Sequence, residues 1–372
     1  MIREWLTTIR LISTLAVTFM VALPVPSTAA QQTTSKTPAR STPAKSTAKT
    51  TTAAKTTTAK KPVAKKKTTK KKTSSATARA RQARARAAAQ AKALAEAQQP
   101  KFRTNEKGEQ VPDVRAEAAI VYNPETGEVL FESNSQNQRS IASITKVMTA
   151  VVFMETEPDL SRKVIIDRSD VRAASTTYLK AGNKVTIGDL LHLTLIASDN
   201  AAARALARVS PMGMPGFIER MNEKARELGL TSTTYVDPSG LYAANLSSAY
   251  DMARLITYVS ADERIASVMR KQYYSMPLGT KTVQVHSTNQ LVMNGDVEVQ
   301  AGKTGFISKA GYCLATLLRL PQGGPSVAVV VLGAKSNAGR FWETRHLLSW
   351  LTSKATELVS GGPVQAVAVP AS

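Results

Sequence analysis

The feature that most constrains this chain is an abrupt change of composition near residue 100. Residues 31–100 consist almost entirely of Ala, Lys, Thr, Ser, Gln, Arg and Pro, contain no aromatic residue, and carry 18 Lys or Arg against one acid, Glu96. Such a segment cannot bury enough apolar surface to offset the entropy lost on folding. We therefore predict a disordered basic linker over residues 31–103, in which the Ala-rich stretch Ala78–Gln98 forms helix transiently.

Residues 101–372 differ in character, because they carry 29 basic and 25 acidic side chains. Most of the formal net charge of +22 therefore belongs to the linker, which excludes a uniformly basic nucleic-acid-binding domain. The lone cysteine, Cys313, excludes an intramolecular disulfide and a Cys-cluster zinc site, and we expect it to be a small buried hydrophobe. The three histidines lack metal-binding spacing, so no metal and no cofactor are expected. We predict a structural role for His192, whereas His286 is left open as a residue of the cleft.

The first thirty residues have the pattern of an export signal. Arg3 and Arg10 precede an uncharged apolar stretch, Leu11–Leu23, and small residues follow at Ser27–Ala30. A basic start, a short apolar centre and a small-residue cleavage site are typical of a signal peptide. The apolar stretch is shorter than the roughly 20 residues that a spanning helix needs. We therefore expect residues 1–30 to be removed and the mature protein to be soluble in the periplasm, without a stable membrane span; an uncleaved anchor is the alternative.

Two roles are compatible with the basic linker after export. Its charge would attract anionic envelope polymers, such as carboxylate-bearing peptidoglycan or phosphorylated glycans, and so tether the protein. A solvated spacer would have the same composition. Lys/Ala/Thr runs are also similar to histone tails, but export argues against a nucleic-acid partner.

Residues 104–360 show strand signals at both ends and helix signals between them, and residues 361–372 are predicted to be a flexible C-terminal tail. Strands are expected at 118–122, 128–131, 282–286, 311–320 and 326–332. Helices are expected from Ser143, over 187–195, over 217–228, from Ser248 and over 340–358. This order predicts an α+β fold in which one antiparallel sheet is closed by both ends of the domain and carries a helical subdomain.

The first of three chemical motifs is a Ser-x-x-Lys sequence at Ser143 and Lys146. Residues three apart share one face of a helix, so the amine would lie beside the hydroxyl. Serine needs a base to become a nucleophile, and a desolvated lysine near another cation can have its pKa lowered enough to serve. Alone, this motif occurs by chance in many helices.

Two further motifs supply polar groups of the kind that bind and protonate a peptide. Ser198 and Asn200 fall between two helical stretches, where a hydroxyl could relay a proton and an amide could hold a substrate carbonyl. Ser-x-Asn also commonly caps a helix, so this motif alone is weak. Lys303, Thr304 and Gly305 form the third motif, whose ammonium and hydroxyl would bind a carboxylate while the glycine permits close backbone approach.

In this order, with spacings of 55 and 105 residues between their first members, the three motifs make a strong combination. Residues 115–358 resemble the low-molecular-mass penicillin-binding proteins, the serine D-alanyl-D-alanine peptidases. The resemblance is carried by Ile141–Ala150, by Asp237–Leu241 with Asn245 and Ser247, and by Ala301–Phe306 with Ala310–Leu314.

The resemblance implies a β-lactamase/transpeptidase-like fold, peptidoglycan peptides as substrates and β-lactams as covalent inhibitors. It implies an acyl-enzyme on Ser143, with Lys146 as base and Ser198 as the third catalytic residue. The oxyanion hole would use the backbone N–H groups of Ser143 and Phe306. The substrate-binding residues would be Asn200, Lys303, Thr304, Gly305 and Phe306.

Within the family that the sequence resembles, the residues after the second motif favour one branch over the β-lactamases and the carboxypeptidases. Class A β-lactamases use an additional Glu for deacylation, and residues 228–262 contain none, so a long-lived acyl-enzyme with β-lactams is expected. Only 67 residues follow Gly305, too few for the second domain that carboxypeptidases of the family usually have. The resemblance thus favours an endopeptidase that cuts D-alanyl cross-links. A carboxypeptidase is the alternative, and a wall- or nucleic-acid-binding protein acting through its basic tail is a third.

Overall fold

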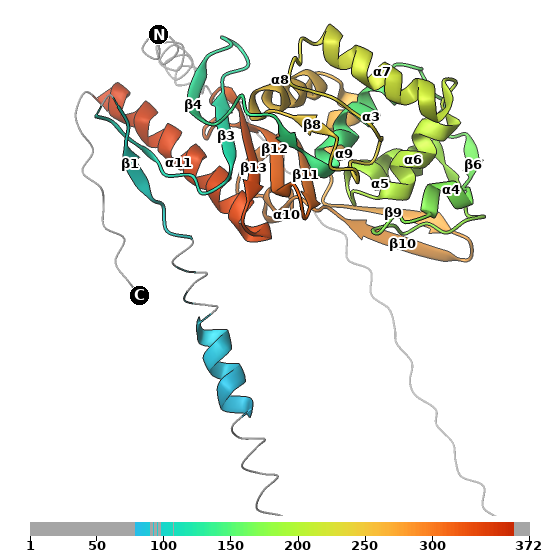
Figure 1. Ribbon diagram of the computed structural model, residues 1–372, viewed down its shortest axis with the longest axis horizontal. Coiled ribbons are helices and arrows are strands. Elements are labelled where there is room, and N and C mark those ends of the chain that lie inside the picture. The colour runs from blue at the N-terminus through green and yellow to red at the C-terminus, as the bar shows by residue number, and fades with distance from the viewer. Residues whose placement is uncertain (1–78, 90–91, 93–94, 96–97, 107, 361–372) are drawn as a thin grey trace, which may run out of the picture. The chain divides into compact units, whose positions relative to one another are not determined.

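The computed structural model describes residues 79–89, 92, 95, 98–106 and 108–360 (Figure 1). The predicted signal peptide and C-terminal tail lie outside the described residues. Residues 79–89 are helical, as the alanine content of this stretch favours. They belong to the unit 13–94, whereas the sheet and helices described below belong to the other unit of the chain.

The folded part is built on an antiparallel five-stranded sheet with the order β11-β12-β13-β3-β4. Strand β3 near the start of the domain pairs with β13 near its end, with Ile120 opposite Val330. The predicted sheet closed by both ends of the domain is therefore confirmed. Its strands are β3 (Ala118–Tyr122), β4 (Val129–Ser133), β11 (Glu298–Ile307), β12 (Gly311–Arg319) and β13 (Ser326–Ala334).

Helices cover both faces of this sheet. Alternate residues of its central strand, β13, therefore pack into two different hydrophobic cores. Val327, Val329 and Val331 of β13 pack in the cluster that contains Phe341 of α11 (Asn337–Ser360). Ala328, Val330 and Leu332 join the cluster that faces the helical subdomain. A strand that is apolar on both sides is typical of such a buried position. Figure 1 shows α11 along one side of the sheet and the helical subdomain beyond its β11 edge.

The helical subdomain surrounds α3 (Thr145–Met154), in which every residue is buried. The helices packed against it are α5 (Ile187–Leu195), α6 (Asn200–Val209), α7 (Gly213–Glu227) and α8 (Ala249–Ser260). Shorter helices are η1 (Ala142–Ile144), α4 (Arg168–Val171), α9 (Glu263–Met269) and α10 (Gln290–Asn294). Two-stranded pairs complete the fold: β1 (Phe102–Thr104) with β2 (Gln110–Pro112), β5 (Arg139–Ser140) with β8 (Leu246–Ser247), β6 (Lys163–Ile165) with β7 (Lys184–Thr186), and β9 (Tyr273–Leu278) with β10 (Lys281–His286).

The helix boundaries follow the capping signals of the sequence. Thr186 accepts a hydrogen bond from the Asp189 N–H while the Asp189 carboxylate accepts from Thr186, which is the predicted capping box of α5. Ser248 caps α8 in the predicted place. Strand β1 overlaps the last two residues of the span 31–103, for which coil was expected. Its three exposed residues carry no apolar alternation that would indicate a strand.

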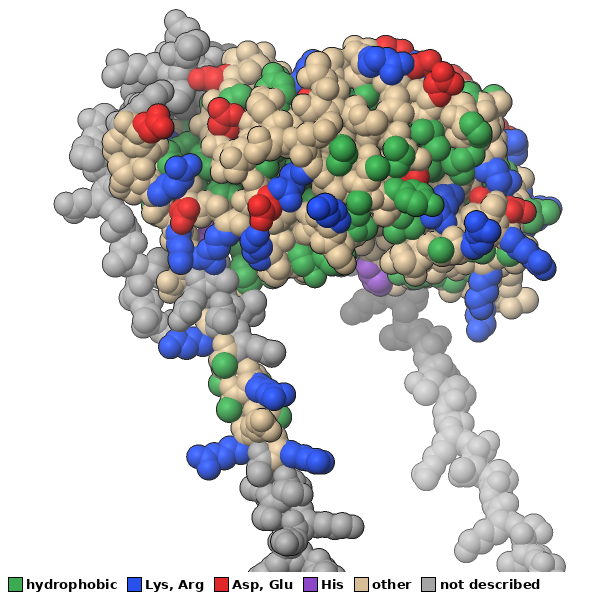
Figure 2. All heavy atoms as spheres, viewed as in Figure 1, with side chains coloured by type: hydrophobic (Ala, Val, Ile, Leu, Met, Phe, Trp, Pro, Cys, Tyr) green, Lys and Arg blue, Asp and Glu red, His purple; other side chains and the backbone are tan. Residues whose placement is uncertain are grey.

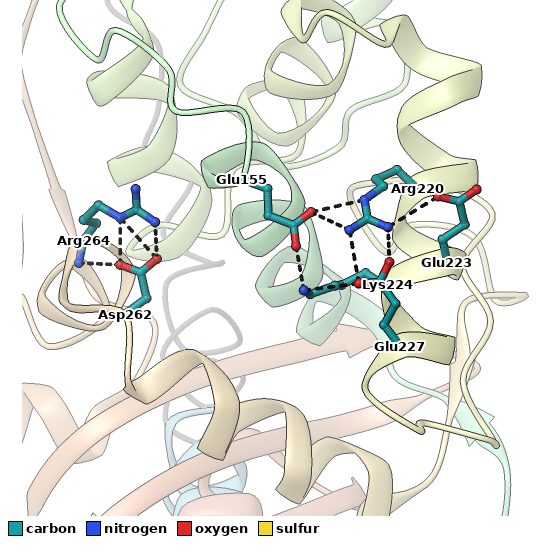
Figure 3. A network of polar contacts seen from close by, with 7 residues as sticks. All are labelled: Glu155, Arg220, Glu223, Lys224, Glu227, Asp262 and Arg264. Carbon is teal, nitrogen blue, oxygen red and sulfur yellow. Dashed lines mark hydrogen bonds and ion pairs between the residues drawn. The ribbon is translucent and has the colours of Figure 1, made fainter.

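The surface of the folded part mixes charges of both signs, in agreement with the composition of residues 101–372 (Figure 2). Figure 3 shows a network that joins the end of α3 to α7: Glu155 contacts Arg220 and Lys224, which also bind Glu223 and Glu227. Partly exposed pairs of this kind contribute about 0.5 kcal/mol each and weaken in salt. The network therefore supports the subdomain modestly and lies on its outer surface.

Candidate active site

The first motif forms a tight turn followed by a helix. Ser143 lies in the single turn η1, directly before α3, and is partly exposed, whereas Lys146 on the first turn of α3 is fully buried. Ala142 has a φ of 49°, a left-handed conformation that costs energy for a residue other than glycine. The surrounding structure must therefore hold this turn in place.

Two glycines from distant segments press against the nucleophile turn. A Cβ on Gly240 would lie 2.1 Å from the Ala142 carbonyl oxygen, and a Cβ on Gly305 would lie 2.7 Å from that of Ile141. Side chains at either position would displace the backbone that carries Ser143. The resemblance pointed to both segments, and the structure shows that both pack directly against the turn that carries Ser143.

The Lys146 amine is held by three oxygen atoms. Its Nζ lies 2.8 Å from Ser143 Oγ, 2.6 Å from Asn200 Oδ1, and within hydrogen-bond distance of the Ser239 carbonyl oxygen. A neutral amine can donate its two hydrogens to the amide and carbonyl oxygens and turn its lone pair to the Ser143 hydroxyl. The geometry is therefore that of a base directed at a nucleophile.

The charge state of Lys146 is tuned by its surroundings. Burial is the main cause that lowers the pKa of Lys146 to about 7. The negative charges of Asp237 and Asp199 raise this pKa, and the positive charge of Arg204 lowers it by a smaller amount. A lysine with such a pKa is substantially unprotonated at neutral pH. It can accept the proton of the Ser143 hydroxyl, which an ordinary lysine cannot do efficiently.

The second motif lies in the turn between α5 and α6. Asn200 accepts from Lys146 and donates through Nδ2 to the Ala174 carbonyl, 2.7 Å away. Asp199 caps α6 by accepting from the Ala202 N–H, so it orients the loop that carries Ser198. Ser198 has a φ of 59°, another left-handed conformation, and its hydroxyl reaches the third motif.

The third motif lies on β11, the edge strand of the sheet beside the helical subdomain (Figure 1). Lys303 is buried, with its Nζ 2.8 Å from Ser198 Oγ and 3.0 Å from the Thr304 carbonyl oxygen. Burial, then the charges of Lys146 and Arg340, lower the pKa of Lys303 well below its usual value. An arriving carboxylate would favour the charged form again, because opposite charges stabilise one another in a buried site.

The structure therefore brings five predicted polar side chains into one connected group. Ser143, Lys146 and Asn200 are linked directly, and Ser198 and Lys303 form a second linked group of the same site. Gly305, two residues after Lys303, approaches the Ser143 turn so closely that a Cβ would clash with its backbone, which places the two groups side by side. Of the remaining predicted residues, Thr304 shares a 2.6 Å hydrogen bond with Thr288, and Phe306 is exposed and stacked on Tyr312.

Other functional contacts had no signal in the sequence. Arg340 donates to the carbonyl oxygens of Gly305 and Cys313, at 3.0 and 3.1 Å, and so braces the third motif from behind. The Ser239 carbonyl is a backbone group, which no residue type reveals. His192 stacks on Tyr274 outside these contacts. Cys313 is a buried thiol, as predicted.

Within the described residues, no cluster of His, Cys, Asp or Glu could hold a metal ion. Across the same part of the chain, no helix combines the length and the apolar character that crossing a bilayer requires.

Comparison with known proteins agrees with this site. Residues 105–336 match the family model described as D-alanyl-D-alanine carboxypeptidase. The chain is similar to a D-alanyl-D-alanine endopeptidase of Escherichia coli, with 31% identity over 64% of this chain and 78% of that protein. It is also similar to the D-alanyl-D-alanine carboxypeptidase DacC of the same species, with 33% identity over 65% of this chain and 62% of that protein.

The fold has solved counterparts. The crystal structure of the Streptomyces K15 DD-transpeptidase matches 64% of this chain and 97% of its own, with a TM-score of 0.60 and 28% identity. That similarity confirms the predicted β-lactamase/transpeptidase-like architecture for the folded part of the chain.

Proposed function

Because the chain belongs to the D-alanyl-D-alanine carboxypeptidase family of serine peptidases, we propose that it is a D-alanyl-D-alanine endopeptidase that cleaves peptidoglycan cross-links. One observation carries the proposal: the Lys146 amine lies 2.8 Å from the Ser143 hydroxyl, fully buried and with a pKa lowered to about 7. The endopeptidase branch is supported by the names of similar proteins in Escherichia coli, Pseudomonas aeruginosa and Haemophilus influenzae.

The chemistry follows from the positions of the side chains. Ser143 Oγ bonds to the carbonyl carbon of a D-alanyl residue while its proton passes to Lys146. When the C–N bond breaks, the proton held by Lys146 passes through the Ser198 hydroxyl to the leaving amine, and the peptide remains as an ester on Ser143. Water then bonds to the ester carbon while Lys146, neutral again, accepts the proton of the water. As the ester C–O bond breaks, Lys146 returns this proton to Ser143 Oγ and the freed acid leaves.

Charge explains why a substrate carboxylate would bind here. Lys303 and Arg340 supply the basic groups of the site, whereas Asp199 and Asp237 are already occupied by hydrogen bonds from the protein. The Lys303 ammonium and the Thr304 hydroxyl would hold the carboxylate next to the scissile bond. A β-lactam presents the same carboxylate and an activated amide, so it would acylate Ser143 as well.

Product analysis separates the endopeptidase from the carboxypeptidase. Purified enzyme incubated with cross-linked muropeptide dimers should yield monomers, because hydrolysis of the cross-link divides the dimer. Chromatography with mass spectrometry measures the products, and the Ser143→Ala variant is the control. Release of free D-Ala from pentapeptides without loss of dimers would contradict the endopeptidase and favour the carboxypeptidase alternative.

The proposed domain organisation is a cleaved signal peptide over residues 1–30, a basic linker over 31–103, a catalytic domain over 104–360 and a tail over 361–372. Export through this signal would place the enzyme in the periplasm. There the linker, with 18 basic residues and one acid over residues 31–100, would hold the enzyme near anionic polymers of the envelope.

A binding assay tests the role of the linker. Mature protein should sediment with purified sacculi, and a version lacking residues 31–100 should sediment several-fold less, because the attraction is electrostatic and fades at high salt. Equal sedimentation of both proteins would show that the linker is a spacer. Binding of the mature protein to DNA but not to sacculi would support the third alternative, a nucleic-acid partner.

A further inference from the structure

We propose that Asp237 is a positioning residue for the proposed reaction: its buried carboxylate shapes the turn that carries the Ser239 carbonyl and supplies negative charge beside Lys146. The proposal rests on the roles assigned above to Ser143 and Lys146. In the sequence analysis Asp237 appears only as the first residue of the segment Asp237–Leu241 that carries the resemblance, and the proposal assigns it a task in catalysis.

The Asp237 carboxylate is the centre of the turn over residues 237–242. Its Oδ1 accepts hydrogen bonds from the N–H and the hydroxyl of Ser239, both at 2.6 Å, and from the Gly240 N–H at 2.9 Å. Its Oδ2 accepts from the Tyr242 N–H at 2.9 Å and from Asn245 Nδ2 at 2.7 Å. Five donors converge on one ionised group, so the path of the backbone through Ser239 depends on this carboxylate.

The same turn is attached to the nucleophile segment at several points. The Ser239 carbonyl oxygen accepts from Lys146, and the Pro238 carbonyl oxygen accepts from the Thr149 hydroxyl at 2.6 Å. The Asn245 carbonyl oxygen accepts from the Ile141 N–H at 3.2 Å. With the close approach of Gly240 to Ala142, these contacts fix both the base and the turn that carries Ser143.

Charge is the second part of the argument. Burial alone would raise the pKa of Asp237, but the hydrogen bonds from Ser239, Tyr242 and Asn245 hold this pKa below its usual value, so the group is ionised at neutral pH. Of the nearby charges that favour the protonated form of Lys146, Asp237 is the strongest and Asp199 is the second.

The charged groups that face Lys146 come from three elements. They are Asp237 on its turn, Asp199 and Arg204 on α6 and its cap, and Lys303 on β11. Two cations and strong desolvation oppose the protonated amine, and two carboxylates favour it. Asp199 accepts hydrogen bonds from the Ala202 and Tyr178 N–H groups and so holds the start of α6. Asp237 instead holds the turn whose Ser239 carbonyl oxygen accepts from Lys146. Asp237 therefore combines the charge with the geometry.

The test is the pH dependence of acylation by a fluorescent penicillin. In the Asp237→Asn variant an uncharged amide replaces the carboxylate, so the rise of the acylation rate with pH should move to lower pH by about one unit. Its plateau should fall by about tenfold, because the amide NH2 meets donors that the carboxylate accepted. Asp237→Glu keeps the charge, so its rise should stay at the wild-type pH even where its plateau is lower.

A matched control is Asp251→Asn, which removes another buried carboxylate. Asp251 accepts from the Ser232 N–H and the Thr233 hydroxyl and is not among the charges that shift the pKa of Lys146. Its loss should therefore leave the pH at which the acylation rate rises unchanged. An Asp237→Asn profile that rises at the wild-type pH would overturn the proposal, whatever its plateau. If circular dichroism shows that Asp237→Asn does not fold, Asp237→Glu becomes the deciding variant. A shift of more than about half a pH unit in the pH at which its acylation rate rises would then overturn the proposal. Failure of the wild type to be labelled would instead refute the proposed function.

Discussion

A Ser143→Ala variant should lose all covalent labelling by a fluorescent penicillin, whereas the wild-type protein should carry one label that survives denaturing electrophoresis. The hydroxyl of Ser143 is the proposed nucleophile and lies 2.8 Å from the buried Lys146 amine. The loss is expected to be complete because acylation requires the new ester bond itself. Fluorescence imaging of the gel, normalised to protein, measures the outcome.

The control for this experiment is Ser161→Ala, which removes an exposed hydroxyl that donates to Asp159 in the loop before β6. It should be labelled at the wild-type rate. Labelling should persist for hours after excess antibiotic is removed, because no Glu occupies residues 228–262 to activate a deacylating water. Residual labelling of Ser143→Ala would show that the nucleophile lies elsewhere and would contradict the assignment of the site.

Much of the fold was accessible from the sequence because local signals agree with the final structure. The capping residues Thr186 and Ser248 begin helices where expected, and the apolar runs of β12 and β13 form the centre of the sheet. The three motifs could be placed in one site only through the resemblance to a family. Their side chains converge because β11 lies beside the helical subdomain, which no local pattern encodes.

The parts that the sequence did not reveal have physical reasons. Strand β11 contains Lys303 and two glycines, residue types that disfavour strands, yet it is held by pairing with β12 and by burial of the lysine. Strand β9 contains Pro277, which is tolerated because it lies in a two-stranded pair. The Ser239 carbonyl and the approach of Gly240 to Ala142 are backbone contacts between segments about 100 residues apart, so no side-chain pattern marks them.

Replacing Lys146 should slow acylation by about 10²–10⁴-fold, the range that a general base contributes. Lys146→Ala removes the proton acceptor and leaves Asn200 Oδ1 and the Ser239 carbonyl oxygen without their buried donor. Stopped-flow or gel-based rates of penicillin labelling measure the effect. Lys335→Ala is the control, because this exposed lysine pairs with Glu117 and should leave the rate unchanged.

The pH profile of the wild type distinguishes a base from a merely structural lysine. Since burial lowers the pKa of Lys146 to about 7, the amine is charged and inactive below this pH and becomes a base above it. The acylation rate should therefore rise with pH through about 7 and be about 100-fold lower at pH 5 than on the alkaline plateau. Lys146→Ala should show no such rise. A wild-type rate that is flat from pH 5 to 9, or that falls as the pH increases, would exclude Lys146 as the group that accepts the proton of Ser143.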